Sequence, residues 1–320
     1  MFTADFEDGA WKNLQIIPYG NIEISPAASS LHYGQAIFEG IKAYKQPDGK
    51  VAIFRPQKNF ERFNISAQRM AMPAVPEAIF MQGMEQLIKL DSAWVPSGEG
   101  HSLYIRPLLF ATDPILGVHA SANYKFVILT GPAGAYYPKP LKVKIEMHYA
   151  RAIEGGVGYA KTAGNYAGSL LPTKLAQNEG YDQLIWTDAK EHAYIEESGT
   201  TNVMFVVNDT LITPSTRDTI LDGVTRHSIL DLARAWGMKV EERRVSVAEI
   251  IEAAKNGTLQ DAFGAGTAAT IAHIAEITYQ GETYTLPAPE NRVFSNKALH
   301  TLKEIRYGLS PDEFGWNRIL

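Results

Sequence analysis

Residues 131–140, GPAGAYYPKP, divide this chain into two parts, and that division constrains the fold more than any other feature of the sequence. The segment is rich in glycine and proline and has no hydrophobic periodicity, as is typical of a loop between domains. Because the chain has 320 residues, each part is long enough to bury a core of its own. We therefore predict a smaller domain over residues 1–133, an interdomain loop over 134–140 and a larger domain over 141–320.

The first part alternates apolar runs with helical patterns. Pro56 occupies the first turn of one predicted helix, where proline is well tolerated. The next predicted helix has one apolar face, made by Phe80, Met84, Leu87 and Ile88. This mixture predicts an α+β domain, with strands at 50–54, 101–110 and 124–131 and helices at 56–71 and 76–94.

The second part continues the same mixture. Asn208 and Asp209 predict a tight turn between two strands, and Ser246 is the expected N-cap of a helix. Gly180 and Gly237 each stand where a helix should end. The predicted strands are 141–147, 182–188, 201–214 with its turn, and 261–274 with a glycine turn, and the predicted helices are 169–180, 224–237, 245–257 and 296–308.

The composition excludes several classes of protein. The 30 basic and 35 acidic residues give a net charge of −5, which argues against a protein that binds nucleic acid through a basic face. The absence of cysteine excludes disulfides, thiolate nucleophiles and cysteine-bound zinc, and the 8 histidines are too dispersed for a short-spaced metal pair. The first residues do not resemble a secretory leader, and no apolar run reaches the roughly 18 residues of a membrane span, so we expect a soluble, cytoplasmic protein.

Lys161 is the one charged residue between Gly155 and Leu170. A lysine with the ordinary pKa of about 10.4 is almost fully protonated at neutral pH, and burial can lower that pKa by roughly 3–5 units. A neutral lysine amine captures an aldehyde as a Schiff base. The plain alternative is a solvated loop lysine, and a P-loop is disfavoured because Ala160 stands where that motif requires glycine.

Two acidic residues, Glu196 and Glu197, end an apolar strand. Neighbours in a strand face opposite sides, so one of the two carboxylates should point inward. An inward carboxylate could hold a protonated pyridine ring, whereas the alternative is a pair of surface acids.

Two turns could bind phosphate. Asp222 and Gly223 precede a predicted helix, so the N–H groups of Val224 and Thr225 lack partners within the helix and lie at its positive end. The GAGT segment at 264–267 offers further N–H groups and the Thr267 hydroxyl. Each turn alone is equally compatible with ordinary helix-start or turn chemistry, and GAGTAA lacks the acidic residue of a dinucleotide-binding motif.

Taken together, several segments resemble the branched-chain amino acid aminotransferases, which are fold-type IV enzymes that carry pyridoxal 5′-phosphate. The segments are AKTAGNYAGSL, YDQLIWTD, YIEESGTTNVMF, LDGVTRHSIL and FGAGTAA. In the first half, SLHYGQAIFEGIKAY, FRPQKNFERF and SLYIRPLLFATDPILGV match the same family in the same order. The match covers nearly the whole chain. It implies an α+β fold with a smaller α/β-sandwich domain and a larger pseudo-barrel domain that binds the cofactor.

The resemblance implies a role for each matching residue at the cofactor. Lys161 matches the Schiff-base lysine, which also moves a proton between the substrate Cα and the cofactor. Tyr166 matches the tyrosine bonded to the phenolic oxygen, and Glu197 matches the carboxylate that keeps the pyridine nitrogen protonated, while Glu196 is expected to be structural. The phosphate is expected on Arg62, the N–H groups of Val224 and Thr225, and Thr267.

The resemblance also implies a substrate pocket. Tyr33 and the N–H groups of Thr267 and Ala268 would hold the α-carboxylate, and Arg106 would support that region and help admit the second carboxylate of glutamate. Thr201 stands where many relatives have methionine. The apolar part of the pocket is expected from Phe38, Tyr104, Tyr136, Thr200, Thr201 and Ala268, with Leu116 and Val118 supplied by a partner subunit.

The function implied is the transfer of the amino group of L-leucine, L-isoleucine or L-valine to 2-oxoglutarate, by a homodimer, as in branched-chain amino acid biosynthesis. D-amino acid aminotransferases and aminodeoxychorismate lyases share the fold and remain alternatives. Long family members have an upstream segment whose final methionine matches Met1, and this segment closes the pocket. A further alternative is therefore a non-catalytic protein that binds pyridoxal phosphate. No metal, nucleic acid or membrane partner is expected.

Overall fold

The computed structural model describes residues 1–134 and 139–320. The chain forms two compact units, each built around its own sheet. The first unit contains residues 1–134, 160–164 and 304–320, and the second contains 165–303 and the described part of 135–159. The short segment 160–164 therefore belongs to the first unit although its neighbours in the sequence on both sides belong to the second.

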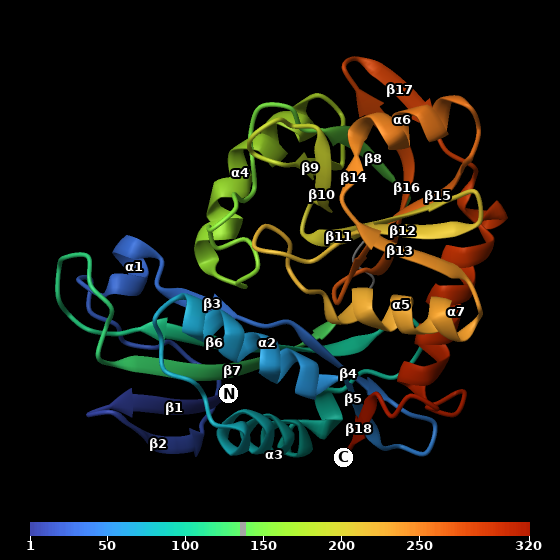
Figure 1. Ribbon diagram of the computed structural model, residues 1–320. Coiled ribbons are helices and arrows are strands. Elements are labelled where there is room, and N and C mark those ends of the chain that lie inside the picture. The colour runs from blue at the N-terminus through green and yellow to red at the C-terminus, as the bar shows by residue number, and fades with distance from the viewer. Residues whose placement is uncertain (135–138) are drawn as a thin grey trace. The chain divides into compact units, whose positions relative to one another are not determined.

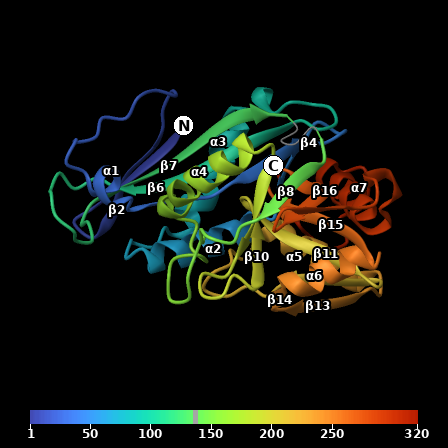
Figure 2. The same ribbon diagram turned by 90° about the horizontal axis from the view of Figure 1, so that it is seen from above.

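The first unit has an antiparallel sheet with the strand order β18-β5-β4-β6-β7-β1-β2, and β3 pairs with β6. Strands β6 (Ser102–Ala111) and β7 (Tyr124–Ala133) run side by side along their whole length in Figures 1 and 2. Buried and half-buried residues alternate along β6, as expected for a strand with one face on a core. The other strands are β1 (Phe2–Glu7), β2 (Ala10–Ile16), β3 (Ala36–Phe38), β4 (Ile41–Lys45), β5 (Val51–Phe54) and β18 (Asn317–Ile319).

Helices cover one face of this sheet. Phe63 of α2 (Pro56–Arg69) and Phe80 of η1 (Ala78–Gln82), a π-helical turn, pack on Phe126 of β7. The ring centroids of Phe63 and Phe126 are 5.6 Å apart, and those of Phe80 and Phe126 are 5.9 Å apart. Helix α3 (Gly83–Leu90) adds Met84, Leu87 and Ile88 to the same core, as the sequence predicts. The short helices are α1 (Ser29–Tyr33) and η2 (Ser92–Trp94).

The last described residues complete the edge of this sheet. Strand β18 pairs antiparallel with β5, with Asn317 opposite Phe54 and Ile319 opposite Ala52. Just before β18, the carbonyl of Trp316 accepts a hydrogen bond of 2.7 Å from the N–H of Arg55, and the Trp316 ring packs edge-on against Phe54. A segment at the end of the chain is thus part of the unit that the first residues form.

The second unit contains a closed barrel. Its strands β11, β15, β16, β8, β9 and β10 are paired in that order, and β10 pairs in turn with β11. Strands β12, β13, β14 and β17 extend the sheet outside this ring. The bounds are β8 (Leu141–Ile145), β9 (Gln183–Thr187), β10 (Tyr194–Ser198), β11 (Thr201–Val207), β12 (Thr210–Pro214), β13 (Lys239–Arg243), β14 (Val245–Ser246), β15 (Leu259–Gly266), β16 (Thr270–Tyr279) and β17 (Glu282–Thr285).

Helices of the second unit pack on this sheet through apolar faces. Ser246 caps α6 by accepting a hydrogen bond from the N–H of Glu249, as the sequence predicts. Ile250 and Ile251 of that helix join a core with Val203 and Phe205 of β11. The helices are α4 (Ala163–Asn178), α5 (Val224–Ala235), α6 (Val247–Lys255), the 3-10 turn η3 (Pro289–Asn291) and α7 (Val293–Tyr307), whose last turn belongs to the first unit.

The observed elements agree with some of the sequence predictions and differ from others. The turn at Asn208 and Asp209 is confirmed, since both residues have positive φ angles, 47° and 55°, between β11 and β12. Helix α4 begins at Ala163, earlier than the predicted residue 169. The hairpin of β1 and β2 was not predicted. Among the residues described here, none of the helices combines the length and apolar character that crossing a bilayer requires.

Candidate active site

The backbone of Lys161 is held on both sides by the first unit. Its N–H donates to the Oγ of Ser66 on α2 at 2.8 Å, and its carbonyl accepts from the N–H of Phe38 at 3.0 Å. The next residue, Thr162, forms an isolated bridge with Ile37 and donates its hydroxyl to the carbonyl of Ala36 at 2.9 Å. Lys161 is half-buried. The backbone of the loop is therefore fixed at this residue, while the half-buried side chain keeps some contact with solvent.

Glu39, which the sequence analysis did not identify, is the charge that organises this region. Its carboxylate is 0% exposed and pairs with the guanidinium of Arg62, Nε to Oε1 at 2.7 Å and Nη2 to Oε2 at 2.8 Å. Asn59 donates to Oε2 at 2.8 Å. Burial works against the ionised form, but the positive charges of Arg62 and Lys161 outweigh it and hold the pKa of Glu39 below its ordinary value.

Arg62, the predicted phosphate ligand, is thus oriented by a buried carboxylate. The side chain lies in the middle of α2 and is 7% exposed. A bidentate pair fixes the plane of a guanidinium, so the direction of its remaining donors is fixed as well. Glu39 stands between Phe38 and Gly40 in the apolar run QAIFEGI, and a single acid in such a run was the available indication of a buried role.

Phe38, Tyr104 and Arg106, three predicted substrate residues, lie together. Tyr104 and Arg106 are two positions apart on β6 and so share a face. The guanidinium of Arg106 lies 4.6 Å from the ring centroid of Phe38, and its Nη2 donates to the hydroxyl of Tyr104 at 2.8 Å. The Nζ of Lys161 is 4.9 Å from the same Phe38 centroid. Phe38 therefore brings an arginine and a lysine into one aromatic cluster.

The Nε of Arg106 is buried and has no hydrogen-bond partner within the described part of the chain. A buried donor of this kind is costly unless a ligand or water accepts its hydrogen bond, so it fits a carboxylate ligand. Tyr33, the other predicted carboxylate residue in this unit, is partly exposed and accepts a hydrogen bond of 3.1 Å from the N–H of Gly117. Leu116 and Val118, on either side of that glycine, are 67% and 88% exposed.

In the second unit, Glu197 is held by an ion pair that the sequence analysis did not predict. Its Oε1 accepts from the N–H of Leu221 at 2.7 Å and lies 3.2 Å from Nη2 of Arg151. Arg151 is anchored in turn, since Nη2 also donates to the carbonyls of Gly158 and Thr219. Glu197 is 3% exposed. A guanidinium and an N–H donor both favour the ionised form of a carboxylate, which is the form that suits a protonated pyridine.

Glu196, the neighbour of Glu197 on β10, is 6% exposed. Both glutamates are therefore buried, and the alternative of a surface acid pair is wrong. Burial is the main cause that raises the pKa of Glu196 to about 7, while Thr219 and Arg151 act in the opposite direction.

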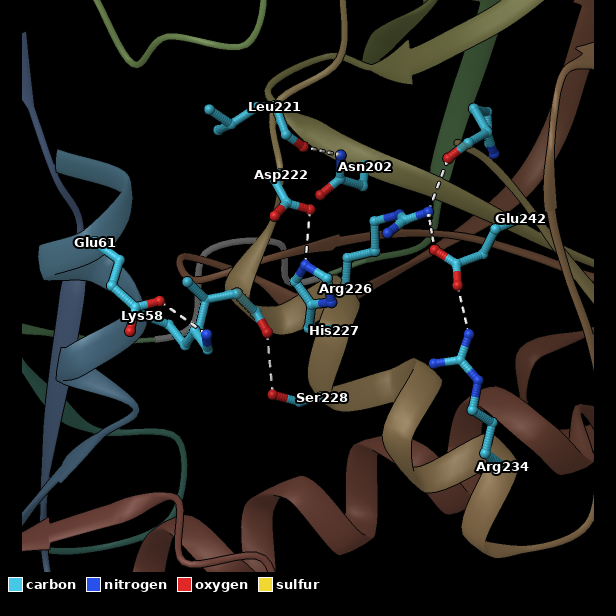
Figure 3. Close-up of polar contacts among 12 residues, drawn as sticks. Lys58, Glu61, Asn202, Leu221, Asp222, Arg226, His227, Ser228, Arg234 and Glu242 are labelled. Atoms are coloured by element: carbon cyan, nitrogen blue, oxygen red, sulfur yellow. Dashed lines mark hydrogen bonds and ion pairs between the residues drawn. The ribbon is translucent and has the colours of Figure 1, made fainter. Parts of the chain in front are cut away.

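The start of α5 has the form of an anion site. Gly223 is its N-cap, with extended backbone angles, and this residue has no side chain with which to cap the helix. Asn202 donates to the carbonyl of Leu221 at 2.8 Å, and its Oδ1 would lie 1.9 Å from a Cβ at position 223, so only glycine fits. The carboxylate of Asp222, the residue before the N-cap, pairs with Nε2 of His227 at 2.7 Å (Figure 3).

Val224 and Thr225, the two residues predicted to bind phosphate at this helix start, are buried, and their N–H groups belong to its first turn. The uncapped helix start therefore fits a phosphate group. Further along α5, Arg226 pairs with Glu242, which also pairs with Arg234, so the cations of this helix are engaged away from its N-terminus (Figure 3).

Thr201 packs against the glycine-rich strand β15. Its Oγ1 donates to the carbonyl of Ser198 at 2.7 Å, and its side chain lies where a Cβ on Gly264 or Gly266 would be. Thr267 and Ala268 lie in the turn that connects β15 to β16 and are half-buried, and Thr200 is exposed. Tyr166 lies in the first turn of α4 and is half-buried. Tyr136 lies outside the described residues.

Residues 36–277 of the chain match the family description "Amino-transferase class IV". The chain belongs to this aminotransferase family. Over its full length it is 47% identical to the probable branched-chain-amino-acid aminotransferase of Staphylococcus aureus strain MRSA252, of which 90% is covered. It is 44% identical to branched-chain-amino-acid aminotransferase 2 of Bacillus subtilis strain 168, with 99% of this chain and 88% of that protein covered.

A solved structure supports the same assignment. The branched-chain amino acid aminotransferase of Thermobaculum terrenum, in its PLP form, matches with a TM-score of 0.78 at 25% identity, covering 99% of this chain and 97% of that chain. The resemblance drawn from the sequence is therefore confirmed, together with the fold-type IV architecture, the aminotransferase class and, at the level of the family, the pyridoxal phosphate cofactor.

The residues of this aminotransferase fit that cofactor. The uncapped start of α5, where a side chain on Gly223 would clash, suits a phosphate, and the buried Glu197 suits a protonated ring nitrogen. The residues that the sequence analysis missed, Glu39 and Arg151, are both buried partners of predicted site residues rather than ligands themselves.

Proposed function

We propose that this protein catalyses transamination between branched-chain L-amino acids (L-leucine, L-isoleucine and L-valine) and 2-oxoglutarate, yielding branched-chain 2-oxo acids and L-glutamate. The observation that carries the proposal is the placement of Glu197, buried and bonded to Arg151 and the N–H of Leu221. An anionic carboxylate held in this way is what a protonated pyridine ring requires. The relatives named above support the choice of branched-chain substrates.

Pyridoxal phosphate, when bound, supplies an electron sink for the bond to the substrate Cα. Lys161 is the residue that takes the proton from the substrate Cα and returns it, because its backbone is fixed at both its N–H and its carbonyl. Glu197 holds a proton on the ring nitrogen, and Tyr166 donates to the phenolic oxygen. We assign the phosphate to Arg62, Thr267 and the N–H groups of Val224 and Thr225, where helix start and guanidinium supply the donors.

Arg106 and Tyr33 are the residues we assign to substrate carboxylates. The buried Nε of Arg106 needs an acceptor, and its stacking on Phe38 holds the guanidinium in place while leaving that edge for a ligand. The N–H groups of Thr267 and Ala268 are the further donors proposed for the α-carboxylate. The side-chain pocket is assigned to Phe38, Tyr104, Tyr136, Thr200, Thr201 and Ala268. Such an apolar pocket separates substrates that differ by one methylene by only about 1–3 kcal/mol, so all three branched side chains should react.

We further propose that the protein acts as a homodimer, in which Leu116 and Val118 of each subunit enter the substrate pocket of the other. Their exposure of 67% and 88% is high for apolar side chains, and the hydrogen bond from Gly117 to Tyr33 ties their loop to a proposed substrate residue. Light scattering gives the mass in solution. A monomer that transaminates L-leucine at full rate would contradict this assignment.

The test of the proposed function is an assay of L-leucine with 2-oxoglutarate, in which L-glutamate and 4-methyl-2-oxopentanoate are measured separately. Lys161→Ala should remove turnover, whereas Lys174→Ala, an exposed lysine of α4, should leave it unchanged. A panel of D-amino acids and aminodeoxychorismate separates the two enzymes that share the fold. Turnover of D-alanine but not of L-leucine would refute the proposal, as would bound cofactor without any turnover.

A further inference from the structure

A cavity of about 640 Å³ lies in the second unit, between the start of β10, the turn that follows β9 and the segment after β12. Its volume is in the range of sites for small organic ligands. None of the residues assigned above to the cofactor or the substrate lines it. The cavity is therefore separate from the proposed catalytic residues, and nothing in the proposed function uses it.

Glu196 lines this cavity, whereas its neighbour Glu197 does not. Glu196 is 6% exposed, and its Oε2 is buried without a hydrogen-bond partner among the residues described. Thr219 interacts with the carboxyl group by a side-chain hydrogen bond. A buried carboxyl oxygen without a donor is costly, so the oxygen is suited to receive one from a ligand.

The charges around Glu196 indicate the sign of that ligand. Burial is the main cause that raises the pKa of Glu196, Arg151 lowers it, and Glu197 and Asp188 raise it further by repulsion. A ligand carboxylate at Oε2 would add a further negative charge to this group. A cation would relieve the repulsion and stabilise the ionised Glu196. The other charged residues of the cavity are Glu154, Asp218, Lys190, Arg217 and Arg244.

The other acids of the wall are less suited to the cation. Asp188 accepts hydrogen bonds from the N–H groups of Glu191, Ala193 and Tyr194, and Asp218 accepts one from Gly155. Ile195, Pro214 and Ile220 give the wall an apolar part. The cavity thus combines one buried acceptor with apolar surface, and its basic side chains Lys190, Arg217 and Arg244 are all exposed.

We propose that this cavity binds a primary ammonium group on a short apolar body, with the ammonium on Oε2 of Glu196. A simple alkylamine and an apolar α-amino acid share this chemistry. An amino acid would in addition place its carboxylate on the exposed cations. The inference does not rest on the proposed function, because Glu196 has no role in the transamination.

The experiment uses the holoenzyme and 3-methylbutylamine, measured by isothermal titration calorimetry at pH 7 in two buffers of different ionisation enthalpy. Since the pKa of Glu196 is about 7, about half of the molecules should release a proton when the ammonium binds. Binding to the cofactor changes its visible absorption, whereas binding in the cavity does not. L-leucine binding at the same cavity would identify an amino acid ligand, and binding of the amine alone would identify an alkylamine.

Glu196→Gln should weaken the binding at least tenfold and abolish the proton release, because it removes the anionic acceptor. Glu154→Gln, at an exposed acid of the same cavity, is the matched control and should change the affinity less than twofold. Ala189→Phe fills the cavity while leaving Glu196 in place, and it should block binding independently of any change at position 196. Unchanged binding to Glu196→Gln or to Ala189→Phe would overturn the proposal, as would tighter binding of 4-methylpentanoate than of the amine.

Discussion

The buried pair of Glu39 and Arg62 gives the sharpest prediction for stability. At 2.7 Å, with an effective dielectric constant of about 20, Coulomb's law gives about 6 kcal/mol of attraction. Desolvation offsets part of this attraction, and removing one partner of a buried pair costs about 3–5 kcal/mol. Glu39→Gln keeps an oxygen acceptor for Arg62 but loses the charge. We therefore expect it to lower the free energy of unfolding by about 3 kcal/mol.

The measurement is urea unfolding followed by tryptophan fluorescence at pH 7. Glu61→Gln is the matched control, because Glu61 lies on the same helix as Arg62 and pairs with Lys58 at 2.8 Å, with both side chains about half exposed (Figure 3). An exposed pair contributes about 0–1 kcal/mol, so this variant should change stability little. Equal stability of the two variants would refute the reasoning.

The same pair predicts a dependence on pH. Arg62 and Lys161 hold the pKa of Glu39 below its ordinary value of 4.5, so the ionised form of Glu39 stabilises the folded state. The stability advantage of the wild type over Glu39→Gln should be complete above pH 4.5 and should fall as the pH drops through the pKa of Glu39 in the folded state. An advantage that grows on acidification would contradict the assigned charge state.

Three further predictions concern residues of the second unit: Arg151, Gly223 and Glu196. Arg151→Met should lower the free energy of unfolding by about 3 kcal/mol and weaken the retention of pyridoxal phosphate during dialysis, because Glu197 would be left buried without its cation. A variant as stable as the wild type would contradict this prediction. Gly223→Ala should cost about 1–3 kcal/mol and raise the dissociation constant for pyridoxal phosphate, since its Cβ would meet Asn202. Gly20→Ala, at an exposed loop glycine with open space around it, is the control and should change neither. Glu196→Gln should be more stable than the wild type by about 3 kcal/mol at pH 8, because a pKa raised to about 7 means that ionisation of Glu196 opposes folding. This difference in stability should vanish below pH 4.5, and a difference that does not depend on pH would contradict the prediction.

Local pattern was sufficient where the fold depends on neighbours in the sequence. The apolar face of α3, the cap at Ser246 and the turn at Asn208 and Asp209 were all predicted and are present. The β1–β2 hairpin was not predicted. Most residues of β2 are exposed or half-buried, so its sequence shows little of the apolar alternation that identifies a strand.

The sequence identifies candidate site residues only where a single residue, by its own type and neighbours, indicates a chemical role. Lys161 and Glu197 are recognisable because one stands alone among small residues and the other ends an apolar strand. Their environments depend on partners that the sequence does not indicate. Glu39 is 23 residues from Arg62, and nothing local links Arg151 to Glu197. Ion pairs of this kind are set by the packing of distant elements, so they appear only in the folded structure.

The pairing of β18 with β5 has a consequence for biosynthesis. A ribosome makes the strands of the first unit early, yet the edge of their sheet stays open until residues 317–319 have been translated and released. Segment 160–164, which carries the proposed catalytic lysine, joins this unit only after the first residues of the second unit have been made. The nascent chain must therefore keep an unfinished sheet from aggregating while the second unit is made, and folding of the first unit is completed only after residues 317–319 have left the ribosome.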